Sequence, residues 1–237
     1  MEGQVTTIPP SIEILYESFL YFELLLHVVG YVVSTSFMIV FSNLRSVHID
    51  LLWILNSFLF SFCVTSVLRV YYCLVILIAV DVESFHSSLT LTANMRDVAT
   101  YVGGLHLLLI AGERLLATAR SKTYEDEQYL AQIGIAVFFL WTFSYFVITT
   151  MKGGVISNFL AAVLFMIIFI VSIGLLVYVR RTNLRSWKRN RGTMPFSHNY
   201  QVHENVTSAR YLYKCIVIFA VQTTIAWISL VIYLVFR

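Results

Sequence analysis

Charged residues are scarce in this sequence. Only 12% of its 237 residues are Asp, Glu, Lys or Arg, whereas 59% are hydrophobic and the mean hydropathy is +0.80. Soluble domains carry about 25% charged residues, and a domain of this length has too little interior to bury so much apolar surface. The shortage of charge therefore excludes an ordinary soluble protein. It predicts an all-α fold, a polytopic bundle of membrane helices in one domain spanning residues 1–237.

The sequence also lacks the residue patterns of several functional classes. Cys63, Cys73 and Cys215 are too few and too scattered for a disulfide framework or a zinc site. No HExxH pair, glycine-rich phosphate loop or GxSxG motif is present. We therefore expect no enzyme, no metal site and no cofactor. The net charge of +3 gives no soluble basic face, so no nucleic-acid partner is expected.

Apolar runs long enough to cross a bilayer are abundant. A hydrocarbon core of about 30 Å requires roughly 20 residues of helix. Six runs meet this length, at residues 19–41, 49–69, 91–117, 131–150, 155–179 and 211–236. The second run continues as far as Val80 and contains Arg69. We interpret it as one long or tilted helix whose Arg69 reaches the outer headgroups, with a re-entrant segment as the alternative.

The positions of lysine and arginine predict how the helices are oriented. With the N-terminus outside, twelve basic residues flank the inner ends of the spans and four lie outside. An excess of Lys and Arg on the cytoplasmic side is the rule for membrane proteins. We therefore expect the N-terminus outside. The longest connection, from Arg180 to Arg210, is then inside and offers a basic surface to a cytosolic partner.

Ionisable residues within spans are candidates for function because a charge in the bilayer is costly. Arg69, Arg96, Asp97 and His106 are candidates for an outer ligand vestibule. Arg69 is equally compatible with an interfacial anchor, and Arg96 with Asp97 forms a self-neutralising surface pair in the alternative interpretation. Glu23 and His27 stand four residues apart, so they face the same way along a helix and can bond each other.

Glu113 and Arg114 lie near the inner end of the third apolar run. They lie in "GERLLATARSKTYEDE", residues 112–127, where a basic and then an acidic stretch follows. At that depth the pair can meet water, headgroups or a polar group on another helix end. On local grounds alone, the pair is equally compatible with a membrane helix that simply ends in charges.

Three motifs in order resemble a known receptor family. "ERLLAT" followed by "YED" resembles the "ER..AT.....YE" pattern of the nematode serpentine chemoreceptors, especially serpentine receptor class epsilon, the Sre family. "HIDLLWI", from His48, resembles the family's "H.N" helix opening, with Asp50 where asparagine is usual. "YQVHENVTSARYL", from Tyr200, resembles its segment leading into span six. These motifs cover the chain from about His48 to Leu212.

The resemblance implies a G-protein-coupled chemosensory receptor in the plasma membrane of sensory neuron cilia. It would bind a small, odorant-like chemical ligand among the outer halves of spans three, five and six, and signal to a heterotrimeric G-protein. The residues that it assigns to the inner switch and G-protein coupling are Glu113, Arg114, Tyr124, Gln201, Glu204 and Asn205.

The sequence departs from the family in one important respect. The family has seven spans, and only six are predicted here, so the expected fold is a seven-helix receptor fold that lacks its last helix. A small multi-pass transporter or channel is the alternative function, because six spans suit such proteins. Transporters often contain internal repeats and broken helices, and neither is evident in this sequence.

Overall fold

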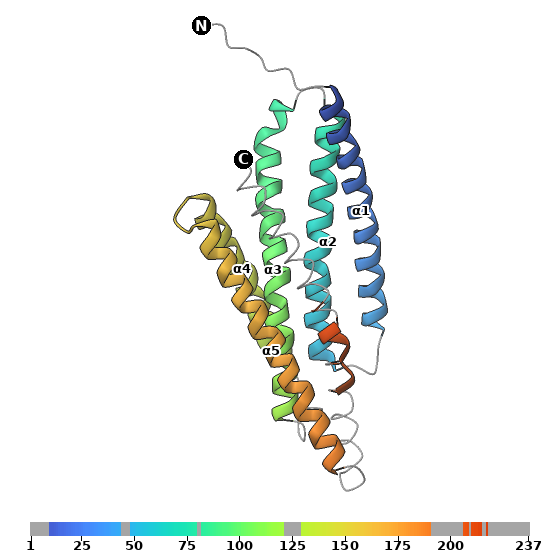
Figure 1. Ribbon diagram of the computed structural model, residues 1–237, viewed down its shortest axis with the longest axis vertical. Coiled ribbons are helices and arrows are strands. Elements are labelled where there is room, and N and C mark those ends of the chain that lie inside the picture. The colour runs from blue at the N-terminus through green and yellow to red at the C-terminus, as the bar shows by residue number, and fades with distance from the viewer. Residues whose placement is uncertain are drawn as a thin grey trace.

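The computed structural model describes residues 10–43, 48–79, 82–120, 129–190, 206–208, 210–214 and 217. The helices are α1 (Pro10–Ser42), α2 (Ile49–Ile78), the short 3₁₀ helix η1 (Glu83–Phe85), α3 (His86–Ala119), α4 (Leu130–Lys152) and α5 (Asn158–Asn190). Residues 206–208 and 210–214 are also helical. The long helices form an elongated bundle in which α1, α2 and α3 lie side by side and α5 runs obliquely to α3 (Figure 1).

The prediction of an all-α membrane bundle is confirmed. Among the described residues, five helices are long and apolar enough to cross a membrane. They correspond to the first five predicted spans, and the chain is a multi-pass membrane protein. Most of the sixth predicted span, residues 211–236, lies outside the described residues. We call the end of the bundle that carries Asp50, Arg114 and the C-terminal half of α5 the basic end, and the other end the opposite end.

The second apolar run forms a single helix. α2 continues without a break from Ile49 to Ile78, as the interpretation of one long helix predicts, and the re-entrant alternative is wrong. His48 precedes the helix, and its Nδ1 accepts the backbone N–H of Asp50 at 3.4 Å. This cap satisfies one of the free N–H groups at a helix start.

The connection between α4 and α5 is longer than the sequence predicts. Hydropathy starts the fifth span at Val155, but α5 begins at Asn158. Gly154 adopts a left-handed conformation with φ of 74°, which glycine reaches without steric cost. The Ser157 Oγ then accepts the backbone N–H of Leu160 at 3.1 Å, and this cap sets the start of the helix.

α3 is the central helix of the bundle. It is the most deeply buried of the five although it is the least apolar, with a mean hydropathy of 1.3. It packs against α2, α4 and α5, whereas α1 packs principally on α2. The main core cluster consists of residues from four helices, Leu51, Ile54, Leu107, Ile110, Ala111, Ile133, Phe169 and Leu176. The polar side chains of His106, Glu113 and Arg114 on α3 are therefore shielded from lipid by its neighbours.

Two adjacent glycines bring α3 close to its neighbours. A Cβ at Gly103 would lie 3.1 Å from the Ser61 Oγ of α2. A Cβ at Gly104 would lie 2.0 Å from the Phe165 ring of α5, which is far inside van der Waals contact. Small residues allow such close approach between membrane helices. The expectation that this doublet serves helix packing agrees with these contacts.

Replacing Gly104 with alanine is expected to destabilise the α3–α5 interface. The Phe165 ring lies between Tyr101 and Phe169, with centroids 5.0 and 5.5 Å away, so it has little room to move. Overpacking of this kind costs about 1–3 kcal/mol. The measurement is the thermal stability of purified Gly104→Ala protein in detergent micelles.

Gly112 provides the matched control on the same helix, because nothing lies within 4 Å of its Cβ position. Gly112→Ala should preserve stability, and Phe165→Leu should restore part of what Gly104→Ala loses. Equal stability of the two alanine variants would contradict a tight contact between Gly104 and Phe165.

Candidate functional site at the basic end of the bundle

Glu113 and Arg114 form a buried ion pair near the basic end of α3. The Arg114 Nε donates to Glu113 Oε2 and Nη2 donates to Oε1, both at 2.5 Å. Arg114 is 1% exposed and Glu113 is 8% exposed. Successive helix positions diverge by about 100°, so neighbours do not normally face each other. Here the two-pronged geometry satisfies both charges where water is scarce.

The same arginine reaches a segment distant in the sequence. Its Nη1 donates to Ser208 Oγ at 3.2 Å. Ser208 belongs to the helical residues 206–208, in which Val206 is buried. This segment follows the long connection after α5. Arg114 therefore joins α3 to the part of the chain that leads toward the sixth predicted span.

Asp50 links α2 to the beginning of α4. Its carboxylate oxygens accept the backbone N–H of Tyr129 at 3.2 and 3.1 Å, immediately before the first residue of α4. A carboxylate at this position is stabilised by the partial positive charge of a helix N-terminus. Asp50 is fully enclosed, with 1% of its surface exposed. The "HIDLLWI" motif thus places a carboxylate in this site as well as a helix cap.

Asn183 and Thr118 add a further polar contact at the basic end. We call this contact, the Glu113–Arg114 pair with Ser208, and the Asp50 carboxylate together the polar layer. The Asn183 Nδ2 of α5 donates to Thr118 Oγ1 at 2.7 Å and to the Val179 carbonyl at 3.0 Å. The Thr118 hydroxyl in turn donates to the Arg114 carbonyl at 2.8 Å. Asn183 is buried. Polar contacts at the basic end therefore connect α2 with α4, and α3 with both α5 and residues 206–208.

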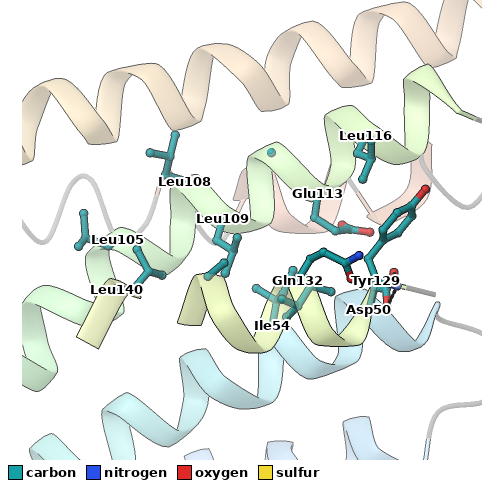
Figure 2. A pocket seen from close by; sticks show the side chains of 13 residues that line it. Asp50, Ile54, Leu105, Leu108, Leu109, Glu113, Leu116, Tyr129, Gln132 and Leu140 are labelled. Carbon is teal, nitrogen blue, oxygen red and sulfur yellow. Dashed lines mark hydrogen bonds between the residues drawn. The ribbon is translucent and has the colours of Figure 1, made fainter. Parts of the chain in front are cut away.

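A groove of about 510 Å³ opens beside this polar layer. It lies along α3, with α2 and α4 forming its other walls. Figure 2 shows that Asp50, Glu113, Tyr129 and Gln132 gather at one end of the groove, whereas Leu105 and Leu140 lie at the other. Its remaining lining residues are Ile54, Leu108, Leu109, Gly112, Leu116, Ile133 and Ala136. The groove is apolar along its length and has two carboxylates at its basic end.

The position of this groove differs from the expected ligand region. The sequence places the ligand among the outer halves of spans three, five and six. The groove instead lies between α2, α3 and α4, and it reaches Asp50 and Glu113. At the opposite end of the bundle, α4 contacts α3 through Val98, Val102 and Ile148.

Arg69 lies against α1 and is bonded there. Its Nε donates to Glu23 Oε1 at 2.6 Å and its Nη2 donates to Oε2 at 2.7 Å. The guanidinium also lies 4.9 Å from the centroid of the Tyr72 ring. His27 is the more distant neighbour of Glu23, with 3.8 Å between Nε2 and Oε1. The principal partner of Glu23 is therefore Arg69, which sequence spacing does not predict.

Arg96 and Asp97 form part of a polar cluster at the opposite end. The Arg96 Nη2 donates to Asp97 Oδ1 at 2.7 Å, and the Lys152 Nζ of α4 lies 2.9 Å from Asp97 Oδ2. Lys152 also bonds the Asn94 side chain. The self-neutralising pair predicted as an alternative is present, and it also joins α3 to α4. Its side chains remain about 30% exposed.

His106 is enclosed between α3 and α2. Its Nδ1 bonds the Val102 carbonyl at 2.8 Å and its Nε2 bonds Ser57 Oγ at 2.9 Å. No part of its surface is exposed. The four vestibule candidates bond to different partners: Arg69 to α1, Asp97 to α4 and His106 to α2. Arg96 bonds Asp97, and it lies, like Arg69, within electrostatic range of His27 and Cys73.

Of the residues assigned to the inner switch, the structure describes Glu113 and Arg114. Tyr124, Gln201, Glu204 and Asn205 lie outside the described residues. Asn183 and Ser208, which contact Thr118 and Arg114, are site residues that the sequence motifs do not include. The sequence feature that could have identified Asn183 as a site residue is its position, an asparagine within the arginine-rich end of an apolar run. Nothing in the local sequence distinguishes Ser208 from other serines.

Comparison of the sequence with models of protein families and with curated proteins finds no match. The resemblance to serpentine receptors therefore depends on the three motifs, and the family stays a prediction.

Exchanging Glu23 and Arg69 tests whether their ion pair holds α1 on α2. Arg69→Ala leaves a partly buried carboxylate without its main partner. The loss of stability should be below the roughly 3–5 kcal/mol that breaking a fully buried pair costs. The exchange variant Glu23→Arg/Arg69→Glu should recover much of that loss. Thermal denaturation of the purified variants in detergent measures the effect.

Glu17→Gln serves as the control, because Glu17 is an exposed acid on the same helix. It should denature like the wild-type protein. If the exchange variant is no more stable than Arg69→Ala, the pair does not contribute through its charge.

Proposed function

We propose that this protein is a G-protein-coupled-receptor-like chemosensory receptor. It binds a small, odorant-like molecule from outside the cell and signals to a cytosolic heterotrimeric G-protein. It lies in the plasma membrane of sensory neuron cilia with its N-terminus outside, so that the basic end of the bundle faces the cytosol. Glu113 and Arg114 form the inner switch.

One observation carries the proposal: the buried Glu113–Arg114 pair lies where α3 meets the segment leading toward the sixth predicted span. The bond from Arg114 to Ser208 joins these two parts. A two-state protein needs contacts that can be exchanged when helices separate. A charged pair held by a few hydrogen bonds suits that role, because its members can rebond to water or to a partner.

The packing of α3 supports a route for coupling along the bundle. The Phe165 ring of α5 lies against Gly104, nine positions before Glu113 on α3. A ligand that enters between the two helices from the opposite end displaces this tight contact. α3 is a continuous helix from His86 to Ala119, so its basic end moves with it. In the resting state Glu113 holds Arg114, and in the active state Arg114 engages the G-protein.

Substitutions in the pair should change the basal activity in opposite directions. Glu113→Gln weakens the contact that holds Arg114, so G-protein activation without ligand should rise. A shift of one to two kcal/mol in the resting equilibrium corresponds to a rise of about 5- to 30-fold. Arg114→Ala should abolish activation, alone or combined with Glu113→Gln. The measurement is nucleotide exchange by a heterotrimeric G-protein in membranes that contain the full chain.

Glu17→Gln is the matched control for Glu113→Gln, because it makes the same substitution at an exposed acid on α1. It should leave basal exchange unchanged. Normal signalling by Arg114→Ala at equal surface expression would contradict the proposal. Ion current or substrate flux without a G-protein would favour the alternative, a small transporter or channel.

A further inference from the structure

The C-terminal part of α5 carries an unusual concentration of positive charge. Residues 180–190 contain five basic residues and no acid, and no Asp or Glu occurs between positions 128 and 203. The apolar part of α5 ends at Val179, after about 20 residues, a length that crosses the hydrocarbon core. The basic residues therefore follow directly where the helix leaves the bilayer. Figure 1 shows this part of α5 extending past the basic ends of α2 and α3.

Four of the five basic residues share one face of the helix. They are Arg181, Arg185, Lys188 and Arg189, and we call them the cationic face. Arg181, Arg185 and Arg189 recur at spacings of four residues, and Lys188 lies three residues after Arg185. The fifth, Arg180, points elsewhere, with its guanidinium 6.0 Å from the centroid of the Tyr213 ring. Within the described part of the chain, no carboxylate forms a salt bridge with the cationic face.

The cationic face continues the surface that α5 presents to lipid. Ile167, Val171 and Tyr178 are exposed by 50%, 46% and 57%, and they precede Arg181 at the same helical spacing. The buried side of α5 lies on the opposite face, with Ser172, Leu176, Val179 and Asn183. The four cations thus face away from the bundle, toward the surrounding leaflet.

Helix geometry places these charges within reach of lipid headgroups. The headgroup region is about 5–8 Å thick on each side of the core. At about 1.5 Å per residue, Arg181 and Arg185 lie about 3 and 9 Å beyond Val179. Lys188 and Arg189 lie farther out, but helical side chains lean toward the N-terminus, which here is the bilayer.

We propose that the cationic face binds the headgroups of anionic phospholipids. Clusters of Lys and Arg directly beyond a membrane helix attract such lipids. The lipid phosphate and carboxylate groups would accept hydrogen bonds from the guanidinium groups, while the acyl chains lie along Ile167, Val171 and Tyr178. This inference does not depend on the proposed receptor function, because it requires only a membrane-spanning α5.

The test uses the full chain reconstituted in phosphatidylcholine bilayers with trace spin-labelled lipid. Electron spin resonance measures the fraction of lipid that is immobilised at the protein. The wild-type protein should immobilise spin-labelled phosphatidylserine in preference to spin-labelled phosphatidylcholine. Arg181→Gln/Arg185→Gln should lower this preference, by up to about fivefold for each charge at the headgroups. Lys188→Gln/Arg189→Gln should lower the preference for phosphatidylserine less, because these residues lie farther from the lipid headgroups.

Two further measurements test whether the preference belongs to the cationic face. Arg180→Gln removes a charge at a similar depth on the same helix, but its guanidinium lies against the Tyr213 ring and not on the cationic face, so this variant should leave the preference unchanged. Immobilised phosphatidylcholine should be the same in all variants, which verifies an intact bundle. An unchanged preference in the Arg181→Gln/Arg185→Gln variant would overturn the proposal. So would loss of the preference on adding inorganic phosphate at constant ionic strength, since the face would then be a site for free phosphate.

Discussion

The need to pair every charge inside the bilayer governs much of this structure. A lone charge at the centre of a membrane helix costs several kcal/mol, and each buried charge in the described helices has a partner. Glu23 bonds Arg69, and Glu113 bonds Arg114. Asp50 accepts the N–H group that precedes α4. The Glu23–Arg69 and Asp50–Tyr129 contacts also join neighbouring helices, whereas the Glu113–Arg114 pair lies within α3.

The burial of α3 follows from the same constraint. It has the lowest hydropathy of the five long helices and the largest buried share. A helix that carries His106, Glu113 and Arg114 is most stable where other helices exclude lipid, because polar groups find hydrogen bonds there. Gly103 and Gly104 allow this close packing by removing the side chains that would hold α2 and α5 away.

The sequence predicts the helices better than their contacts. Bilayer thickness sets a minimum length for apolar runs, so all five spans can be located, although α5 continues to Asn190, past the apolar run that ends at Val179. The predicted start of α5 is wrong because Ser157, a cap, is not distinguished by hydropathy. Spacing favours His27 as the partner of Glu23, yet Arg69 binds it from 46 residues away. Such partners depend on how helices rotate against each other, which one sequence does not specify. The Glu113–Arg114 pair can be located because its residues are adjacent, but its bond to Ser208 cannot.

The ion pair between α1 and α2 has a consequence for biosynthesis. Its members occupy two consecutive helices, and α1 packs principally on α2. Glu23 and Arg69 can therefore neutralise each other as soon as this hairpin enters the bilayer, before α3 has been synthesised. Each of the two helices alone would carry an unpaired charge into lipid, whereas the hairpin inserts as an electrically balanced unit.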